Sequence, residues 1–346
     1  MEELGGYPFR PAWWLRNRHA QTVFGALLRR PPRIRRTRET WETPDGDAVR
    51  LHFAPDPDVR APFLLILHGL EGSADSNYAP GLQGLFGRAG WGSAVLEFRS
   101  CGGVMNKTPR LYHSGATEDL AFAVDRLQRR FPTRPLYVAG MSLGGNVLLK
   151  WLGEAPEAVP AAVRGAAAIC PPFDLTVAGP HIDRAWGGLY ARWFLRSLIP
   201  KAIEKERQFP GCLDAERVRA CRSFMAFDNH ATAPLHGFRD VHDYWSRASC
   251  GQYLPGIRVP TLLVASADDP FNPASTLPKA AVRDSAYLHP LFTTHGGHGG
   301  FVHGPAPWRP RYWAEEQTLR FCQACEALRR DSGVSLPARD PYSSSP

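Results

Sequence analysis

Residues 136–153 read LYVAGMSLGGNVLLKWLG, in which an apolar run leads through a G-x-S-x-G turn into a segment with helical spacing. A strand, a sharp turn and a helix in this order hold the serine at the tip of the strand, where a strained backbone exposes its hydroxyl group. A phosphate-binding loop fits less well, because Lys150 lies six residues past Gly144 and the lysine of such a loop directly follows its last glycine. The turn therefore predicts Ser142 as a nucleophile, provided that the chain also supplies a base and an acid.

Short apolar runs recur on both sides of this turn and alternate with amphipathic segments. A helical spacing of apolar residues joins Leu120, Val124 and Leu127, and a Pro-Asp-Gly turn near residue 45 predicts a hairpin. Buried strands that alternate with helices predict an α/β fold, with a mostly parallel sheet covered by helices on both faces. The expected strands are FLLIL (63–67), AVLEF (94–98), LYVA (136–139), AAAIC (166–170), TLLVAS (261–266) and PLFTT (290–294).

About 90 residues separate the expected strands AAAIC and TLLVAS, where a simple crossover needs about a dozen. This interval predicts a helical insertion at about residues 171–255. Its first half carries an apolar helical face, which either packs on the main core or covers a ligand cleft as a lid. On the second interpretation the substrate-lining residues are Trp186, Tyr190, Trp193 and Phe194.

A serine nucleophile needs a base that removes its proton and a carboxylate that orients the base. In an open α/β sheet these should follow the serine as acid and then histidine, each after a late strand. TLLVAS leads into ADDPFNP and PLFTT leads into HGGHGGF. We expect Asp269 to be the acid, with Asp268 as the alternative, and His298 to be the base, because its flanking glycines suit an exposed imidazole better than the position of His295 does.

Acyl transfer also needs backbone N–H groups that are fixed in advance around the developing oxyanion. One donor usually belongs to the residue after the nucleophile, which is Leu143 here. The other comes from the loop after an early strand, and the His-Gly turn in LLILHGLEGS makes the amide of Leu70 the candidate.

The 346 residues carry a formal net charge of +8, and six arginines fall within residues 29–38. Two prolines interrupt this run and no aromatic residue interleaves with it, so nucleic acid is not an expected partner. The segment is either a solvated connector or a patch that contacts an anionic membrane.

Seven scattered cysteines predict a reducing compartment, and without an export signal or an apolar span we expect a soluble, cytoplasmic protein.

Three parts of the chain are expected. Residues 1–40 form an N-terminal segment that packs on the core and contains the basic connector, residues 41–330 form the main domain, and residues 331–346 form a disordered polar tail. The CxxC of Cys322 and Cys325 falls in an amphipathic helix at residues 313–330 without a second Cys/His pair nearby, so no metal site is expected.

Several motifs together resemble the YheT-like branch of the α/β-hydrolase superfamily. The resemblance covers roughly residues 8–320 and implies an α/β-hydrolase fold, a triad of Ser142, Asp269 and His298, and carboxylic-ester hydrolysis. This chemistry is nucleophilic and acid–base, so no metal or cofactor is expected. Ser100 departs from the family, which usually has glycine there, and His19 and Gln21 receive no role. The motifs are PAWWLRNRHAQT (11–22), HGLEGS (68–73), FRSCGG (98–103), RLYHSGATEDL (110–120), GMSLGGN (140–146), HGFRDVHDYW (236–245), ADDPF (267–271) and GGHGGF (296–301).

Three functions are compatible with these residues. The resemblance implies a serine esterase that acts on short- to medium-chain or lipid esters. Because eukaryotic relatives also transfer medium-chain acyl groups, the first alternative is an acyltransferase that passes the acyl group to an alcohol. The second is a non-catalytic binding protein on a hydrolase scaffold, for which a complete triad would serve no purpose.

Overall fold

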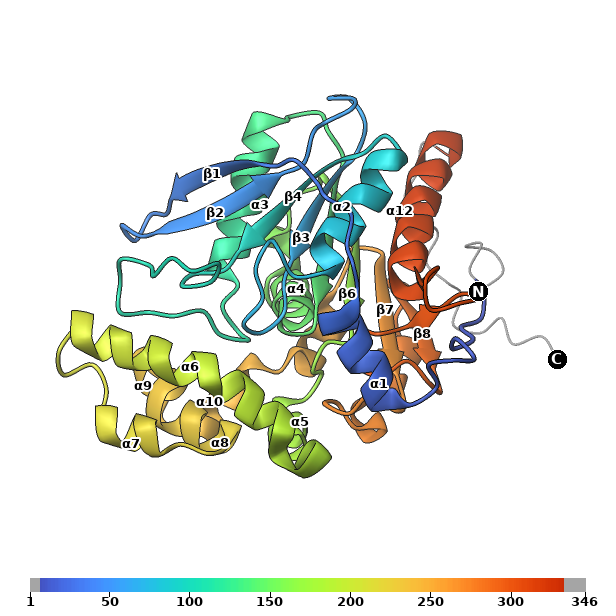
Figure 1. The fold of residues 1–346 in the computed structure, drawn as a ribbon. Helices are drawn as coiled ribbons and strands as arrows, with labels where there is room; N and C mark the ends of the chain where they lie inside the picture. The colour runs from blue at the N-terminus through green and yellow to red at the C-terminus, as the bar shows by residue number, and fades with distance from the viewer. Residues whose placement is uncertain (1–6, 333–346) are drawn as a thin grey trace.

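The computed structural model describes residues 7–332 and contains an eight-stranded sheet in the order β1-β2-β4-β3-β5-β6-β7-β8 (Figure 1). β1 and β2 form the expected hairpin, β2 pairs antiparallel with β4, and all other pairs within this sheet are parallel. The α/β prediction is confirmed. The strands are β1 (Thr37–Glu42), β2 (Ala48–Phe53), β3 (Phe63–Leu67), β4 (Gly92–Glu97), β5 (Leu136–Met141), β6 (Val163–Ile169), β7 (Thr261–Ser266) and β8 (Leu288–Thr293).

Helices cover both faces of the sheet because side chains alternate along each strand. In β3, Phe63, Leu65 and Leu67 belong to one apolar core, which also contains Val124 of α3 (Glu118–Arg130) and Leu148 of α4 (Leu143–Glu154). Leu64 and Ile66 belong to the other core, on the side of α2 (Tyr78–Arg88) and α12 (Trp313–Ser332) (Figure 1). Short elements complete this part: α11 (Lys279–Arg283), η3 (Pro156–Ala158), η7 (Ala274–Thr276), β9 (Val302–His303) and β10 (Arg311–Tyr312).

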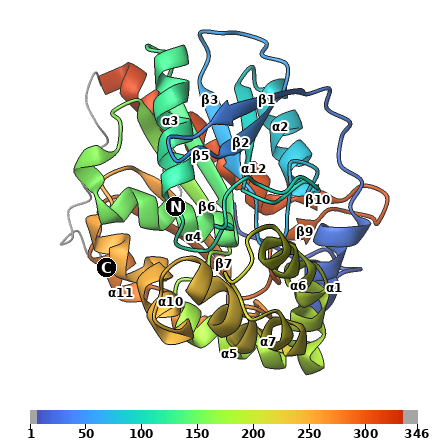
Figure 2. The same ribbon diagram turned by 90° about the vertical axis from the view of Figure 1, so that its left-hand side faces the viewer.

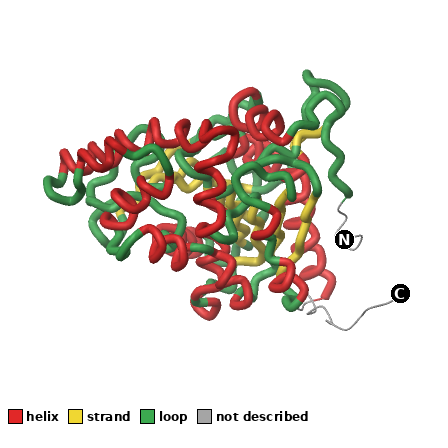
Figure 3. The backbone as a smooth tube through the Cα atoms, turned by 90° about the horizontal axis from the view of Figure 1, so that it is seen from below, coloured by secondary structure: helices red, strands yellow, loops and turns green. Residues whose placement is uncertain are grey.

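The interval between β6 and β7 is helical, as expected, and lies beyond the carboxyl ends of the parallel strands (Figures 1 and 2). It has an apolar core of its own, formed by residues such as Leu195, Leu198, Val241 and Trp245. Seen from this end, the helices lie across the yellow strands (Figure 3). They are α5 (Leu175–Arg184), η4 (Ala185–Gly188), α6 (Leu189–Gln208), α7 (Ala215–Ala220), α8 (Phe224–Phe227), η5 (Asp228–Thr232), α9 (Ala233–Leu235), α10 (Val241–Ala248) and η6 (Cys250–Gly256).

The N-terminal segment runs through α1 (Arg18–Val23) and η2 (Phe24–Leu28) and is anchored by charged side chains. Arg29 is buried, forms a bidentate ion pair with Glu315 of α12, and lies 3.6 Å from the centre of the Tyr312 ring. Arg36 donates to Gln83 and Asp75, both at 2.7 Å. Two of the six arginines in the basic run therefore serve the fold.

Residues 333–346, nearly all of the expected disordered tail, lie outside the described residues. In the part of the chain that is described, no helix combines the length and the apolar character that crossing a bilayer requires.

Candidate active site

Ser142 occupies the sharp turn between β5, which ends at Met141, and α4, which begins at Leu143. Its backbone has φ 52° and ψ −118°, a conformation that a residue with a side chain rarely adopts. The Ser142 amide donates to the carbonyl of Ile169 at 2.8 Å, which ties the turn to the end of β6. The sequence forms this strained turn because a strand and a helix are joined by a single residue.

Two glycines allow the turn to pack. A Cβ atom on Gly140 would lie 2.4 Å from the carbonyl oxygen of Gly144, and a Cβ atom on Gly144 would lie 2.6 Å from the carbonyl oxygen of His68. Both distances are far below van der Waals contact, and the atoms met are backbone atoms that cannot rotate away. The close approach of β5, α4 and the loop after β3 therefore requires glycine at both positions.

His298 links Ser142 to Asp269, although these residues come from three distant parts of the chain. The Nε2 atom of His298 lies 2.9 Å from Oγ of Ser142, and its Nδ1 atom lies 2.9 Å from Oδ2 of Asp269. Because the carboxylate accepts, Nδ1 carries the proton in the neutral ring, and Nε2 is left to accept from the serine hydroxyl. The side chains of His298 and Asp269 are only 10% and 2% exposed, so little water competes for these bonds.

Asp269 is held in place by its own turn. Its Oδ1 atom accepts from the amides of Phe271 at 2.7 Å and Asn272 at 3.1 Å, and the Asn272 side chain donates to Oδ2 at 3.2 Å. The Phe271 ring stacks on the imidazole of His298, with the ring centres 4.1 Å apart. The D-P-F-x-P turn thus fixes both the carboxylate and the plane of the histidine.

Asp268 and His295, the alternatives left open by the sequence, form a separate pair. Asp268 accepts from the Gly297 amide at 2.9 Å and lies 3.4 Å from Nδ1 of His295. The side chain of His295 is 58% exposed. These two residues support the loop that carries His298 and do not contact Ser142.

The N-terminal segment supports the same loop, a role that sequence reasoning missed. Thr22 accepts from the backbone amide of His298 at 2.9 Å. The buried Gln21 side chain donates to the carbonyls of Leu15 at 2.7 Å and Val302 at 2.9 Å, and accepts from the Val302 amide at 2.7 Å. The motif RHAQT was the available signal, and its hydrogen bonds explain why these residue types occur there.

His19, from the same motif, contacts the helical insertion. Its Nδ1 atom lies 3.0 Å from the hydroxyl of Tyr190, and its ring stacks on Trp186 with centres 5.0 Å apart. Asn146 of α4 makes a second such link, because its side chain donates to the Ala248 carbonyl at 2.7 Å and accepts from the Cys250 amide at 3.0 Å. The insertion is therefore tied to both the N-terminal segment and the helix that follows Ser142.

Leu70 and Leu143, whose amides are the expected oxyanion donors, line the cavity that contains Ser142. Leu143 is the first residue of α4, so its N–H has no acceptor within the helix and lies at the positive end of the helix dipole. The loop of Leu70 passes close by, since a Cβ atom on Gly69 would lie 3.3 Å from Cβ of Ser142. The Gly69 amide donates to the buried hydroxyl of Tyr78 at 2.7 Å, which fixes the loop just before Leu70.

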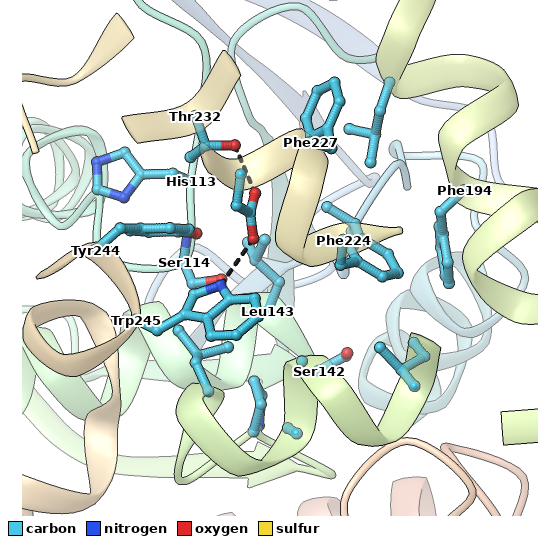
Figure 4. A pocket seen from close by; sticks show the side chains of 18 of the residues that line it. His113, Ser114, Ser142, Leu143, Phe194, Phe224, Phe227, Thr232, Tyr244 and Trp245 are labelled. Atoms are coloured by element: carbon cyan, nitrogen blue, oxygen red, sulfur yellow. Dashed lines mark hydrogen bonds between the residues drawn. The ribbon is translucent and has the colours of Figure 1, made fainter. Parts of the chain in front are cut away.

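The cavity beside Ser142 and His298 has a volume of about 130 Å³. In Figure 4, Phe194, Phe224 and Phe227 lie on one side of it and His113, Tyr244 and Trp245 on the other. Most of its lining comes from the insertion and is apolar, including Leu175, Ala178, Ile182, Phe194, Leu198, Phe224 and Phe227.

Of the four aromatic residues expected to line a cleft, Phe194 alone borders this cavity. Tyr190 packs behind the site against Phe271, with ring centres 4.7 Å apart. Trp186 and Trp193 are 50% and 55% exposed, so the expectation was wrong for them. The helix does not begin until Leu189, because residues 186–188 all have positive φ angles, and this kink takes Trp186 off the face of α6.

Cysteine residues near the site and in α12 could be read as metal ligands. Cys170, Asp269 and His298 have ligand atoms within 4.8 Å of one another. However, both ring nitrogens of His298 are already hydrogen-bonded, and burial raises the pKa of the Cys170 thiol well above its usual range, so the thiol stays protonated. Burial also raises the pKa values of Cys322 and Cys325, which pack in the core beneath the sheet.

Ser100, the departure from the family pattern, lies in a left-handed turn with φ 59°. Its hydroxyl hydrogen-bonds to Asn106, whose side chain donates to Asp47 at 2.6 Å. The serine thus helps to order the loop at residues 100–108, at the cost of a backbone conformation that glycine adopts more readily.

Comparisons with known proteins agree with this fold. The α/β hydrolase fold family matches residues 62–211. YheT of Escherichia coli (strain K12) is 35% identical over 89% of this chain and 91% of its own length. The human protein named Phospholipase ABHD3 is 25% identical over 88% of this chain and 76% of its own. Among solved structures, the esterase Pf2001 of Pyrococcus furiosus has a TM-score of 0.55 at 16% identity, with 87% of this chain and 98% of that chain covered.

Proposed function

This chain belongs to the YheT-like branch of the α/β-hydrolase superfamily, and we propose that it hydrolyses carboxylic esters through a triad of Ser142, His298 and Asp269. The observation that carries the proposal is the continuous chain of two 2.9 Å hydrogen bonds from Asp269 through His298 to Ser142. The strained turn of Ser142 and the position of Leu70 and Leu143 along the cavity support the proposal further, because acyl transfer needs an exposed nucleophile and backbone donors for the oxyanion.

In the proposed reaction, Oγ of Ser142 attacks the ester carbonyl carbon while its proton passes to Nε2 of His298. Asp269 keeps Nδ1 protonated and stabilises the imidazolium that forms. The negative charge on the tetrahedral oxygen is held by the amides of Leu70 and Leu143. His298 then protonates the departing alcohol, and the acyl group remains on Ser142. Water enters, gives a proton to His298 and attacks the acyl-enzyme, which releases the acid and restores the serine.

The substrates we propose are short- to medium-chain acyl esters or lipid esters. Support comes from the apolar lining of the cavity and from its volume of about 130 Å³, which is close to the ~150 Å³ of an engineered cavity that binds benzene. An apolar group of roughly six carbons would fill it. Two relatives carry names that refer to lipid esters, Phospholipase ABHD3 and the Monoacylglycerol lipase of Saccharomyces cerevisiae.

We also propose peripheral contact with anionic lipid through part of the basic segment. Arg29 and Arg36 are engaged in the fold, which leaves Arg30, Arg33, Arg35 and Arg38 as the exposed cations. Vesicle sedimentation with and without phosphatidylserine, using a variant with serine at these four positions, would test the contact. Salt-independent binding, or binding that the variant retains, would contradict it.

The seven free cysteines support a reducing, cytoplasmic location.

The test of the proposed function is turnover of p-nitrophenyl esters with two to twelve carbons in the acyl group, together with labelling by a fluorophosphonate probe. Hydrolysis with Ser142 as the labelled residue is the expected result. Repeating the assay with added glycerol and analysing the products would separate hydrolysis from acyl transfer, because only the second yields glycerol esters. Absence of both labelling and turnover would favour a non-catalytic binding protein.

A further inference from the structure

Glu71 follows Leu70 in the loop after β3 and has a positive φ angle of 55°. A residue with a side chain is uncommon in this left-handed region and stays there only when its surroundings hold it. Glu71 is bonded directly to Leu70, so whatever holds Glu71 also restrains the direction of the Leu70 amide from the side opposite to the Gly69–Tyr78 hydrogen bond.

Two side chains hold Glu71. The Tyr112 hydroxyl accepts from the Glu71 amide at 2.6 Å and donates to its carboxylate at 2.9 Å. Nζ of Lys201 donates to the same carboxylate oxygen at 2.7 Å. The pair is largely sequestered from solvent, with the Glu71 and Lys201 side chains 8% and 22% exposed.

These two partners come from different parts of the molecule. Tyr112 is fixed to the main domain, where its ring stacks on Phe98 with centres 5.7 Å apart and planes 6° apart. Burial raises the pKa of Tyr112 well above that of an ordinary tyrosine, so its hydroxyl keeps the proton that it donates. Lys201 instead belongs to α6 of the helical insertion, and it borders the same cavity as Leu70 and Ser142.

We propose that the ion pair between Lys201 and Glu71 couples the position of α6 to the oxyanion hole, so that the Leu70 amide is aimed at the reacting carbonyl when the insertion covers the site. Lys201 and Glu71 are positioning residues, because they act through the loop and not on the substrate. The inference rests on the proposed function, in which Leu70 stabilises the oxyanion.

The coupling follows from the environment of the carboxylate. A sequestered charge that loses its cation is strongly unfavourable and turns towards water when it can. If α6 moves away, Glu71 therefore loses one of the two side chains that hold its left-handed conformation, and Tyr112 alone restrains the loop less firmly. Backbone donors contribute to catalysis only when they are fixed before the charge develops, so relaxation would lower kcat more than it changes substrate binding.

Lys201→Met tests the proposal, with Lys205→Met as the matched control. Lys205 lies one turn further along α6 and also ties the helix to the main domain, through the carbonyls of Asn106 at 2.7 Å and Thr108 at 2.6 Å, but it does not contact the loop of Leu70. We expect Lys201→Met to lower kcat by roughly 10- to 100-fold with KM changed less than threefold, and Lys201→Arg to recover most of the loss. Lys205→Met should lower Tm and leave kcat within twofold of the wild type.

A second pair of measurements keeps the test decisive if Lys201→Met folds poorly. Glu71→Gln removes the charge and retains a partner for Tyr112, so kcat should fall as in Lys201→Met, and the double variant should be no worse than either single one. The proposal is overturned if kcat stays within twofold, if only KM rises, if Lys205→Met causes the same loss of kcat, or if the two losses are additive. Failure of the proposed function would look different, because the wild-type protein would then lack Ser142-dependent turnover.

Discussion

The Oδ2 atom of Asp269 lies 2.9 Å from Nδ1 of His298, whereas its neighbour Asp268 accepts from the Gly297 amide and lies 3.4 Å from His295. Asp269→Asn should therefore lower kcat on the order of 10⁴-fold, because an amide cannot hold the imidazole in the required tautomer. Asp268→Asn should cost less than tenfold. Steady-state kinetics of both variants checks the ranking, and the reverse order would transfer the role of the acid to Asp268.

Ser142→Ala should abolish probe labelling and lower kcat on the order of 10⁴-fold or more, since the nucleophile is lost while the two oxyanion donors remain. Alanine keeps the Cβ atom and therefore the same backbone strain, so Tm should stay close to that of the wild type. Ser197→Ala is the control, because the Ser197 hydroxyl donates to the Phe194 carbonyl within α6. This variant should behave as wild type. Undiminished turnover in the Ser142 variant would disprove the assignment.

Phe194→Ala should weaken the preference for longer acyl chains, because Phe194 borders the cavity. In the wild type, each buried methylene contributes at most about 0.8 kcal/mol, so kcat/KM should rise by about two orders of magnitude from acetate to hexanoate esters. Trp193→Ala is the matched control, since Trp193 is the adjacent aromatic residue and is largely exposed. A flattened profile in the Trp193 variant, or an unchanged one in the Phe194 variant, would contradict this description of the cavity.

Gln21→Leu should lower Tm by roughly 5 °C or more, because it leaves the buried Val302 amide and the Leu15 carbonyl without their partner, while the Val302 carbonyl still accepts from the Ala12 amide. Each unsatisfied buried group costs about 1–3 kcal/mol. Gln208→Leu, at an exposed position of α6, is the control. Differential scanning calorimetry measures both, and equal Tm values would show that the N-terminal segment does not stabilise the His298 loop.

Asp228 should make the protein less stable as pH rises. Burial raises its pKa to about 6, against the opposing hydrogen bonds from Thr232 and Trp245. Between pH ~4 and ~6 the folded state therefore keeps this proton while the unfolded chain releases it. The contribution of Asp228 to the free energy of unfolding is fully present below pH ~4 and is lost as pH rises through about 6. It amounts to about 3 kcal/mol at most.

Asp228→Asn should remove this dependence. Urea unfolding at pH 5 and pH 8 would measure it, and the fall in stability between the two pH values should be smaller in the variant than in the wild type. Identical falls would mean that Asp228 does not titrate in this range in the folded protein.

The sequence by itself determined the parts of the site that depend on local geometry. A strand, a G-x-S-x-G turn and a helix within 18 residues leave the chain few conformations, and glycines at 140 and 144 are required by contacts within that unit and with the adjacent strand. The order of strands also placed Asp269 and His298 after late strands of a parallel sheet, whose carboxyl ends meet at one edge. The D-P-F-x-P turn that begins at Asp269 was the reason to predict Asp269 as the acid, with Asp268 as the alternative.

Tertiary structure alone decided which residues of the insertion face the cavity and which support the site. The apolar pattern of α6 serves several partners at once, since Leu195 and Leu198 pack in the core of the insertion, Phe194 borders the cavity and Trp193 faces solvent. The contacts of Thr22 with His298 and of Lys201 with Glu71 join residues 276 and 130 positions apart. The periodicity of a sequence describes only the neighbours of a residue along its own helix or strand. Contacts between distant segments depend on how whole elements pack. This packing is determined by all the apolar surfaces of the chain, which compete for burial.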